Sequence, residues 1–343
     1  MTDLVKNPAS HAPPAMLGNR DTAGTYELRA SRIDLLSISL ATAGLGGAWR
    51  AAAGSYPGAL PVSDGLYALS GLIWLLLVWQ YLRHGGAGWT NLRHDIRQPD
   101  QGFTLSYVPV IGMLITGHFS RFGMEPARWL YALFAILAVL IAARVLAHWV
   151  TDGLDSTALH PGYLLPLSSA PLIASVTASV LELPAIADAA FAIGMLYSLI
   201  IGTIVLGRLV TQGRLPERAR PTLTILTIPP AVGGIAWLVS HQGVVDAVAY
   251  GFTGVLFFTV VVIAFLLPEL RQTRFHLGMW IFIFPVAATT NFTIRLVAGL
   301  DTWIAPALTW GLLTVATAAF VWLAGATLVH TRRTEKLKSA EGL

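Results

Sequence analysis

The sequence predicts an all-α polytopic membrane protein, with ten transmembrane helices arranged as five helical hairpins in a quasi-fivefold ring around a central pore. Three observations support this fold class. Apolar residues make up 55% of the 343 residues and charged residues only 12%. The mean hydropathy of +0.65 is typical of a protein embedded in a bilayer. Ten long apolar segments follow one another, and every second segment is rich in Ser, Thr, Gly and Pro.

Each apolar segment is long enough for a membrane helix, which needs about 20 residues to cross roughly 30 Å of hydrocarbon. The runs are continuous and lack the period-two alternation of barrel strands, so we interpret them as helices. Ten crossings place both termini on the same side. The expected spans are 33–53, 63–83, 103–120, 126–150, 162–181, 185–208, 220–240, 244–268, 276–298 and 302–330.

The odd-numbered segments begin near residues 33, 103, 162, 220 and 276, a nearly constant spacing once the long 84–102 loop is allowed for. Repeats of one helical hairpin bury a face only against their neighbours, and five such hairpins can close into a ring. The even-numbered segments are mostly bulky and aliphatic, as lipid-facing helices are. The odd-numbered segments are therefore expected to form the inner helices.

Polar and small residues of the odd segments are candidates for lining a pore, and their prolines are candidates for kinks. A proline removes a backbone hydrogen bond and bends a membrane helix. Close packing between helices is the commoner role of any one small residue, but confinement of the pattern to alternate helices favours a pore for the set. The pore-lining candidates are Ser39, Thr42, Gly112, Thr116, Ser175, Thr227, Gly233 and Thr289, and the kink candidates are Pro109, Pro171, Pro229, Pro230 and Pro285.

Basic residues orient the bundle. Of the 22 Lys and Arg residues, only Arg50, Arg121, Arg128 and Arg295 fall on the side away from the termini. The positive-inside rule therefore predicts a multi-pass protein of the cell inner membrane with both termini in the cytoplasm. Residues 1–32 are expected to form a disordered cytoplasmic tail without a signal peptide, residues 33–330 the transmembrane channel domain, and residues 331–343 a cytoplasmic C-terminal tail.

The net charge of +4 follows from this topology, and no basic patch interleaved with aromatic residues indicates a nucleic-acid partner. The chain has no cysteine, which excludes disulfides and thiolate chemistry. It also lacks an H-E-x-x-H motif and an embedded His pair, so an enzyme and a cofactor are not predicted. His148, Asp152, Asp155 and His160 share one loop region, but their loose spacing is typical of solvated residues, and no metal site is predicted.

Ionisable residues inside the expected spans are scarce. Glu182, Asp188 and His118 lie near segment ends, where water or headgroups can solvate them. Carriers coupled to protons generally keep an acid or His near the midplane, so the pattern disfavours such coupling. Arg295 is a candidate for attracting anions, and pairing with Glu182 or with a lipid phosphate is the alternative.

Three stretches resemble the tellurite-resistance and dicarboxylate transporter family that also includes the plant guard-cell slow anion channels. They are LGMWIFIFPVAATTNFT with Trp280, Phe284 and Pro285, HPGYLLPLSSAPLIAS from His160, and IRQPDQGFTLSYVPVIGMLI. The resemblance implies ten helices in five hairpins, a pore through each protomer, and a homotrimer in which every protomer conducts independently. It also implies that a phenylalanine matching Phe284 blocks the pore midway.

Helix geometry is compatible with that role for Phe284. The residue lies eight positions after His276, which is about 12 Å at 1.5 Å per residue and near the middle of a core of roughly 30 Å. A large apolar ring there can gate by obstruction and by dewetting. Packing between helices is the alternative role, and Phe282 is the second gate candidate. Ser39 stands where we expect a proline from the family, which predicts a straighter first helix.

The sequence thus predicts an anion-selective channel or uniporter that conducts small monovalent anions, with membrane lipid as its surroundings. The alternative is a proton-coupled carrier or exporter of C4-dicarboxylate, sulfite or tellurite. The absence of a midplane acid favours the channel.

Overall fold

A computed structural model describes residues 35–83, 104–153, 159–300 and 303–340, and the side chains of Asp152 and of residues 334–340 are not described. Regular structure in these ranges is helical, without a strand. The inner helices are α2 (Leu36–Ala52), α5 (Tyr107–Phe119), α7 (Ala170–Val180), α9 (Ile228–Ser240) and α12 (Ile283–Gly299). The outer helices are α3 (Leu60–Tyr81), α6 (Met124–Asp152), α8 (Pro184–Thr211), α10 (Ala247–Phe265) and α13 (Ala305–Ala340).

Eight helical segments in the described ranges are long and apolar enough to cross a membrane. The other two expected spans, 33–53 and 103–120, correspond to α2 with 17 residues and α5 with 13 residues. Helix α5 is short because 3₁₀ turns flank it at both ends, η3 (Thr104–Ser106) and η4 (Ser120–Phe122). The all-helical membrane fold is confirmed.

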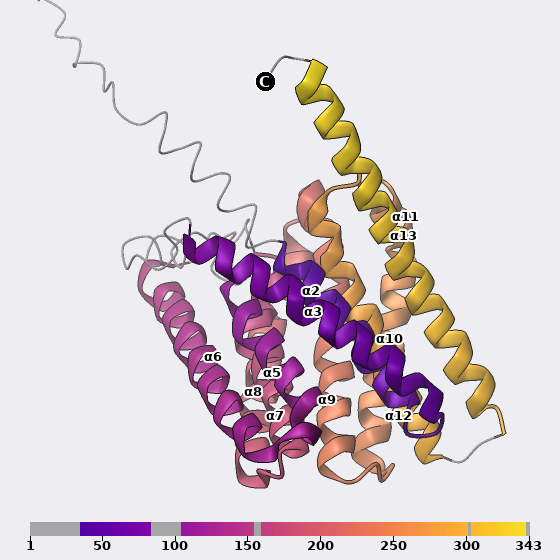
Figure 1. The fold of residues 1–343 in the computed structure, drawn as a ribbon. Coiled ribbons are helices and arrows are strands. Elements are labelled where there is room, and N and C mark those ends of the chain that lie inside the picture. The colour runs from indigo at the N-terminus through magenta and orange to yellow at the C-terminus, as the bar shows by residue number, and fades with distance from the viewer. Residues whose placement is uncertain (1–34, 84–103, 154–158, 301–302, 341–343) are drawn as a thin grey trace, which may run out of the picture.

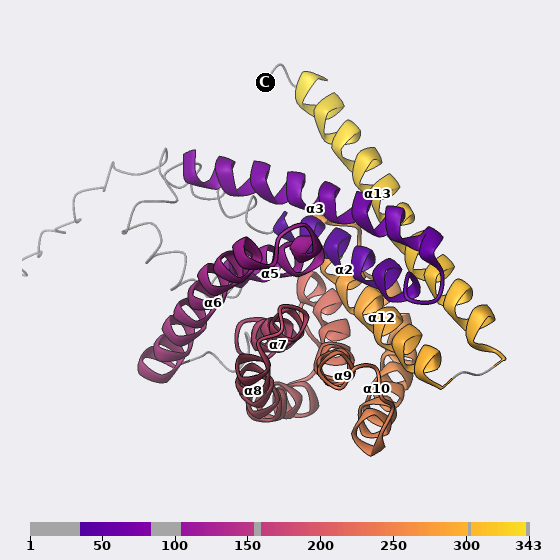
Figure 2. The same cartoon turned by 60° about the horizontal axis from the view of Figure 1, so that its bottom comes forward.

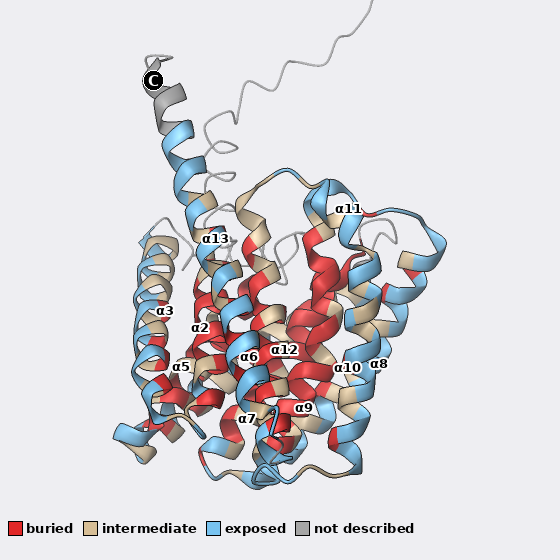
Figure 3. Cartoon of the chain, turned by 90° about the vertical axis from the view of Figure 1, so that its right-hand side faces the viewer, coloured by how far each residue is buried: buried red, intermediate tan, exposed pale blue. Residues whose placement is uncertain are grey.

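The alternation in the sequence is an alternation in burial. In the most apolar window of each outer span, 17 to 22% of the residues are buried. The corresponding share is 78% in the spans that contain α7 and α9 and 56% in the span that contains α12. Figure 3 shows this difference: pale blue, which marks exposed residues, is frequent on the outer helices, and red, which marks buried residues, is frequent on the inner ones. The bulky outer segments present apolar side chains outward because lipid solvates them there.

Each inner helix packs against the outer helix that follows it, so the chain forms five helical pairs: α2 with α3, α5 with α6, α7 with α8, α9 with α10, and α12 with α13. The inner helices also contact one another in sequence order, and α12 closes the series by packing against α2. Figure 2 shows the outer helices surrounding this inner group.

Four inner helices change helix type where the expected kinks lie. Segments η3, η6 (Leu165–Ser169, a π-helix), η7 (Glu217–Thr227) and η8 (Leu277–Phe282) lead directly into α5, α7, α9 and α12. The kink candidates Pro109, Pro171, Pro229, Pro230 and Pro285 each occupy the second or third position of the α-helix that follows. A proline in the first turn sacrifices no α-helical hydrogen bond, so it starts a new helical segment there.

Shorter helices complete the connections: η1 (Pro57–Ala59) before α3, η5 (Pro161–Tyr163) before η6, and α11 (Leu267–Arg271) after α10. Helix α13 continues to Ala340, past the expected domain end at 330, and Figure 1 shows it projecting beyond the other helices. The expected tail 1–32 and loop 84–102 lie outside the described residues.

Candidate functional site

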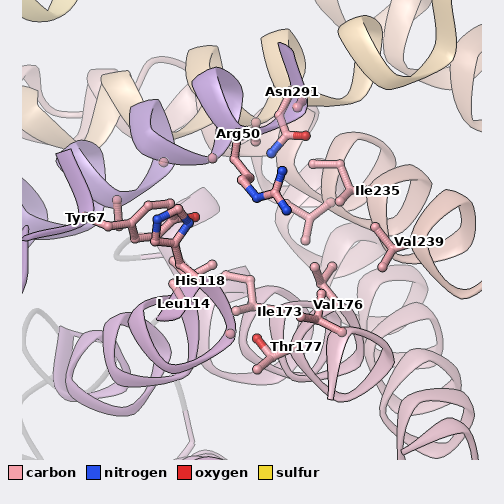
Figure 4. Close-up of a pocket in the computed structure, with 18 of the residues that line it drawn as sticks. Arg50, Tyr67, Leu114, His118, Ile173, Val176, Thr177, Ile235, Val239 and Asn291 are labelled. Carbon is pink, nitrogen blue, oxygen red and sulfur yellow. The ribbon is translucent and has the colours of Figure 1, made fainter. Parts of the chain in front are cut away.

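A cavity of about 340 Å³ lies between the inner helices. All five inner helices contribute to its wall, and Figure 4 shows several of the side chains that line it. One lining residue from each helix is Gly44 on α2, His118 on α5, Thr177 on α7, Val239 on α9 and Phe284 on α12. Because every inner helix reaches it, this cavity is the candidate site for a pore.

Phe284 and Arg295 mark the two extremes of the cavity wall along α12. Eleven residues separate them, which corresponds to about 16 Å along the helix. Phe284 is only 5% exposed. A β-carbon added to Gly44 would lie 2.8 Å from Cδ2 of Phe284. Glycine therefore allows the aromatic ring to lie directly against α2.

Among the described residues, the cavity lining contains three arginines, Arg50, Arg121 and Arg295, together with His118, and no carboxylate. Asp64 of α3 accepts from Arg121 at 2.6 Å and contacts Nε2 of His118 at 2.7 Å. This single carboxylate therefore compensates Arg121.

Neither Arg50 nor Arg295 has an ion-pair partner among the described residues. Arg295 Nε donates to Asn291 Oδ1 at 2.8 Å, which leaves its charge uncompensated. Glu182 lies 3.6 Å from Arg128. The pairing of Arg295 with Glu182 that the sequence left open is therefore wrong, because Glu182 lies in the turn between α7 and α8 beside Arg128.

His118 is held between two helices of the site. Its ring stacks on Tyr67 with a centroid distance of 4.0 Å and an interplanar angle of 14°. Its Nδ1 is buried without a hydrogen-bond partner among the described residues. The ring is therefore fixed in place by stacking and by Asp64.

Three of the predicted pore-lining residues lie at contacts between inner and outer helices. The Ser39 hydroxyl lies 2.9 Å from the Ser70 hydroxyl of α3. β-Carbons added to Gly112 and Gly233 would meet Phe134 of α6 and Phe252 of α10, respectively. These positions allow the outer helices to approach closely.

The other five candidates also lie outside the lining of this cavity. Thr42 donates to the Ile38 carbonyl and Thr227 to the Thr224 carbonyl, both within their own segments. Thr116 and Ser175 are buried, and Thr289 is half-buried. A role for these residues elsewhere along the expected pore stays a prediction.

Phe282, the second gate candidate, packs against the apolar cluster that includes Trp280 and Ile283 and does not line the cavity. Pro229 and Pro230 line a separate apolar cavity of about 580 Å³ between α8, α9 and α10. The described residues contain no group of three His, Asp or Glu side chains that could hold a metal. Nδ1 of His160 accepts from the Gly162 amide, and Asp155 lies outside the described residues.

The sequence-based prediction used Arg50 for topology alone and did not include Asp64, Tyr67 or Asn291 among the candidate site residues. A signal for Arg50 was present in the sequence. It is one of the four basic residues on the side away from the termini, and it follows the small residues of an inner segment.

Residues 33–328 match the SLAC1 family model, which is described as a voltage-dependent anion channel. The chain belongs to the SLAC1 family. It is 24% identical over 255 residues to the tellurite resistance protein TehA homolog of Haemophilus influenzae, covering 74% of this chain and 77% of that protein.

The chain is also 29% identical over 107 residues to the S-type anion channel SLAH2 of Arabidopsis thaliana, covering 31% of this chain and 20% of the plant protein. The family resemblance predicted from the three sequence stretches is confirmed. Membership of the SLAC1 family supports anion transport by a multi-pass membrane protein.

Proposed function

We propose that this SLAC1-family protein is an anion channel or uniporter that passes small monovalent anions through a pore gated by Phe284. The observation that carries the proposal is the cavity, to which every inner helix contributes, with Phe284 at one extreme of its α12 wall and Arg295 at the other. A buried phenyl ring obstructs and dewets a narrow path. Two guanidinium groups without a described ion-pair partner favour anions over cations at the Arg295 end of the cavity.

The expected surroundings belong to the same proposal. The protein lies in the cell inner membrane with both termini in the cytoplasm, so the end of the cavity that carries Arg50 and Arg295 faces the periplasm. The five helical pairs form a quasi-fivefold ring, and three copies assemble into a homotrimer in which each copy conducts. Cross-linking in native membranes would test the homotrimer, and single-channel recording would test whether each copy conducts.

Reconstitution tests the main proposal. Purified protein in a planar bilayer with a chloride gradient should give currents that reverse near the chloride equilibrium potential. Phe284→Ala should raise those currents. Currents that reverse at the cation potential, or flux that requires a pH gradient, would refute the channel assignment.

A proton-coupled carrier for C4-dicarboxylate, sulfite or tellurite is the second candidate. One observation favours it: His118 lines the cavity, and its Nε2 lies 2.7 Å from Asp64, a carboxylate outside the lining. Proton uptake measured together with tellurite or sulfite uptake, and lost in His118→Ala, would support the carrier in place of the channel.

A further inference from the structure

The apolar cavity of about 580 Å³ between α8, α9 and α10 is separate from the candidate pore. Helix α9 packs against both outer helices, and Figure 2 shows it between them. Leu199 on α8 and Phe258 on α10 line the cavity and are 68% and 69% exposed. The cavity is therefore a groove on the outer surface of the bundle, with α9 behind it, and we call it the α8–α10 groove.

The α8–α10 groove offers a ligand apolar surface only. Among the described residues, its lining contains no ionisable side chain and two hydroxyl groups. The Ser198 hydroxyl donates to the Gly194 carbonyl at 2.6 Å, and the Thr259 hydroxyl donates to the Val255 carbonyl at 2.8 Å. Both hydroxyls are thus satisfied within their own helices. An alkyl chain can pack against such a lining, whereas a polar group would lose its hydrogen bonds there.

The length of the α8–α10 groove is that of one lipid leaflet on α8. Its lining runs from Met195 to Leu206 on this helix, which is about 16 Å, and one leaflet contributes about 15 Å of a core of roughly 30 Å. Both lining residues of α9 lie in its first turn, and Leu226 of η7 also lines the groove. On α10 the lining extends from Val248 to Val262. Most of the groove therefore lies in the leaflet on the η7 side.

Arginines gather at the η7 end of the groove, where α10, α11 and η7 pack together. Residues 212–227 and 266–276 contain five arginines and two glutamates. Glu269 pairs with Arg214 at 3.0 Å, and Glu217 accepts from the backbone amide of Arg274 at 2.7 Å. Three exposed arginine side chains have no partner among the described residues: Arg218, Arg271 and Arg274. This end of the groove is therefore positively charged.

We propose that the α8–α10 groove binds one acyl chain of an anionic phospholipid, whose phosphate contacts the arginines at the η7 end. Arginine clusters at a membrane surface attract anionic headgroups, and the apolar groove accepts the chain. A second copy of this protein in the same orientation would bring its own arginines to the same membrane level, so charge complementarity favours the anionic lipid. This site lies outside the candidate pore and is independent of gating by Phe284.

Two glycines in the lining allow the groove to be filled. A β-carbon added to Gly202 on α8 or to Gly251 on α10 would meet nothing within 4 Å. Gly202→Leu and Gly251→Leu should therefore occupy the groove without a clash inside the protein. The matched controls are Gly207→Leu on α8 and Gly254→Leu on α10, because these glycines also meet nothing within 4 Å and do not line the groove. Each control makes the same change in helix propensity.

Thermal unfolding of the delipidated protein in uncharged detergent micelles tests the site. Phosphatidylglycerol, phosphatidylcholine with the same chains, and glycerol phosphate, which has no chain, are each titrated. A ligand that binds the native state raises the unfolding midpoint. We expect a saturable rise with phosphatidylglycerol, an apparent affinity at least about tenfold weaker for phosphatidylcholine, and no rise with glycerol phosphate.

Variants separate the chain site from the headgroup site. Gly202→Leu and Gly251→Leu should each weaken the apparent phosphatidylglycerol affinity at least about tenfold, whereas their controls should keep it within about twofold. Arg218→Gln and Arg271→Gln should each weaken it about fivefold and leave the phosphatidylcholine response unchanged. Arg128→Gln, which removes a charge that pairs with Glu182 in another part of the bundle, should have no effect.

Photo-cross-linking of the wild-type protein keeps the proposal testable if a variant does not fold. Phosphatidylglycerol with a diazirine on its acyl chain should label peptides that contain residues 195–206 and 248–262. Equal midpoints in the two lipids, an equal loss in Gly254→Leu, or labelling spread evenly over the outer helices would overturn the site. A full rise with glycerol phosphate alone would assign the arginines to free phosphate and would also overturn it. A smaller oligomer in Gly202→Leu with an unchanged lipid response would assign the groove to a second copy instead.

Discussion

Replacing Phe284 with alanine is the sharpest test of the gate. The phenyl ring is 5% exposed, lines the cavity, and lies directly against Gly44 of α2. The contact with Gly44 leaves the ring no space toward α2, so the ring must occupy the inner part of the cavity. If Phe284 is the proposed gate, Phe284→Ala should remove an obstruction from the cavity.

We expect Phe284→Ala to lower the stability of the protein and to raise its anion flux. Truncating a fully packed core phenylalanine costs about 3–5 kcal/mol, and we expect the lower end, about 3 kcal/mol, because one side of this ring faces a cavity. Each 1.4 kcal/mol removed from the transport barrier raises the rate about tenfold. Loss of obstruction and of dewetting should together raise anion flux at least about tenfold.

Gly44→Ala should shift the position of the Phe284 ring while leaving the phenylalanine side chain itself in place. The added β-carbon would lie 2.8 Å from Cδ2 of Phe284, which forces the ring away from α2 and further into the cavity. We expect lower flux than in the wild type, and the double variant with Phe284→Ala should restore it.

Chloride efflux from proteoliposomes, normalised to correctly inserted protein, measures both variants. The matched control is Phe292→Ala on the same helix, where the ring is 1% exposed and packs against Gly234 outside the cavity lining. The control should lose stability without gaining flux. Wild-type efflux in folded Phe284→Ala, or equal gains in Phe284→Ala and Phe292→Ala, would refute the gate.

Further predictions concern selectivity, coupling and packing. Reversal potentials should show that nitrate passes at least as readily as chloride, because the structure places no carboxylate in the cavity lining and nitrate is the more weakly hydrated anion; a sharp preference for one divalent anion would contradict this. Gly112→Ala should lower the stability measured by thermal unfolding by about 1–3 kcal/mol, because its β-carbon would lie 2.7 Å from the Phe134 ring, whereas Gly202→Ala, which meets nothing within 4 Å, should not. Neutralising single titratable groups should leave chloride flux within a few-fold of wild type, since charges near the interfaces are screened over about 8 Å; flux driven by a pH gradient and abolished by one change would indicate a carrier. The changes are Glu182→Gln, Asp188→Asn, His118→Ala and His148→Ala.

The fold class and the family follow from the sequence alone. Long apolar runs have one stable form in a bilayer, because every backbone polar group must be satisfied within the chain. The alternation between polar and bulky segments separated α2, α5, α7, α9 and α12 from the outer helices, because lipid accepts only apolar side chains. The 276–298 stretch identified both the SLAC1 resemblance and Phe284, which the structure places on the cavity wall.

Which face of each inner helix meets the cavity depends on how the helices pack and is not visible in the sequence. Consecutive residues differ by about 100° around a helix, and small or hydroxyl residues serve close packing as well as a polar path. Ser39, Gly112 and Gly233 consequently face outer helices, although their types suggested lining. No residue type in the sequence shows this rotation.

Helix packing also determines which charges are compensated. Asp64 on α3 contacts both His118 and Arg121 from 54 and 57 positions away in the sequence, and Glu182 lies beside Arg128. Asp64 and Glu182 are thus engaged away from Arg50 and Arg295. Ion pairs form between whichever side chains the packing of helices brings within a few ångströms, so the uncompensated positive wall beside Asn291 follows from how α2 and α12 pack.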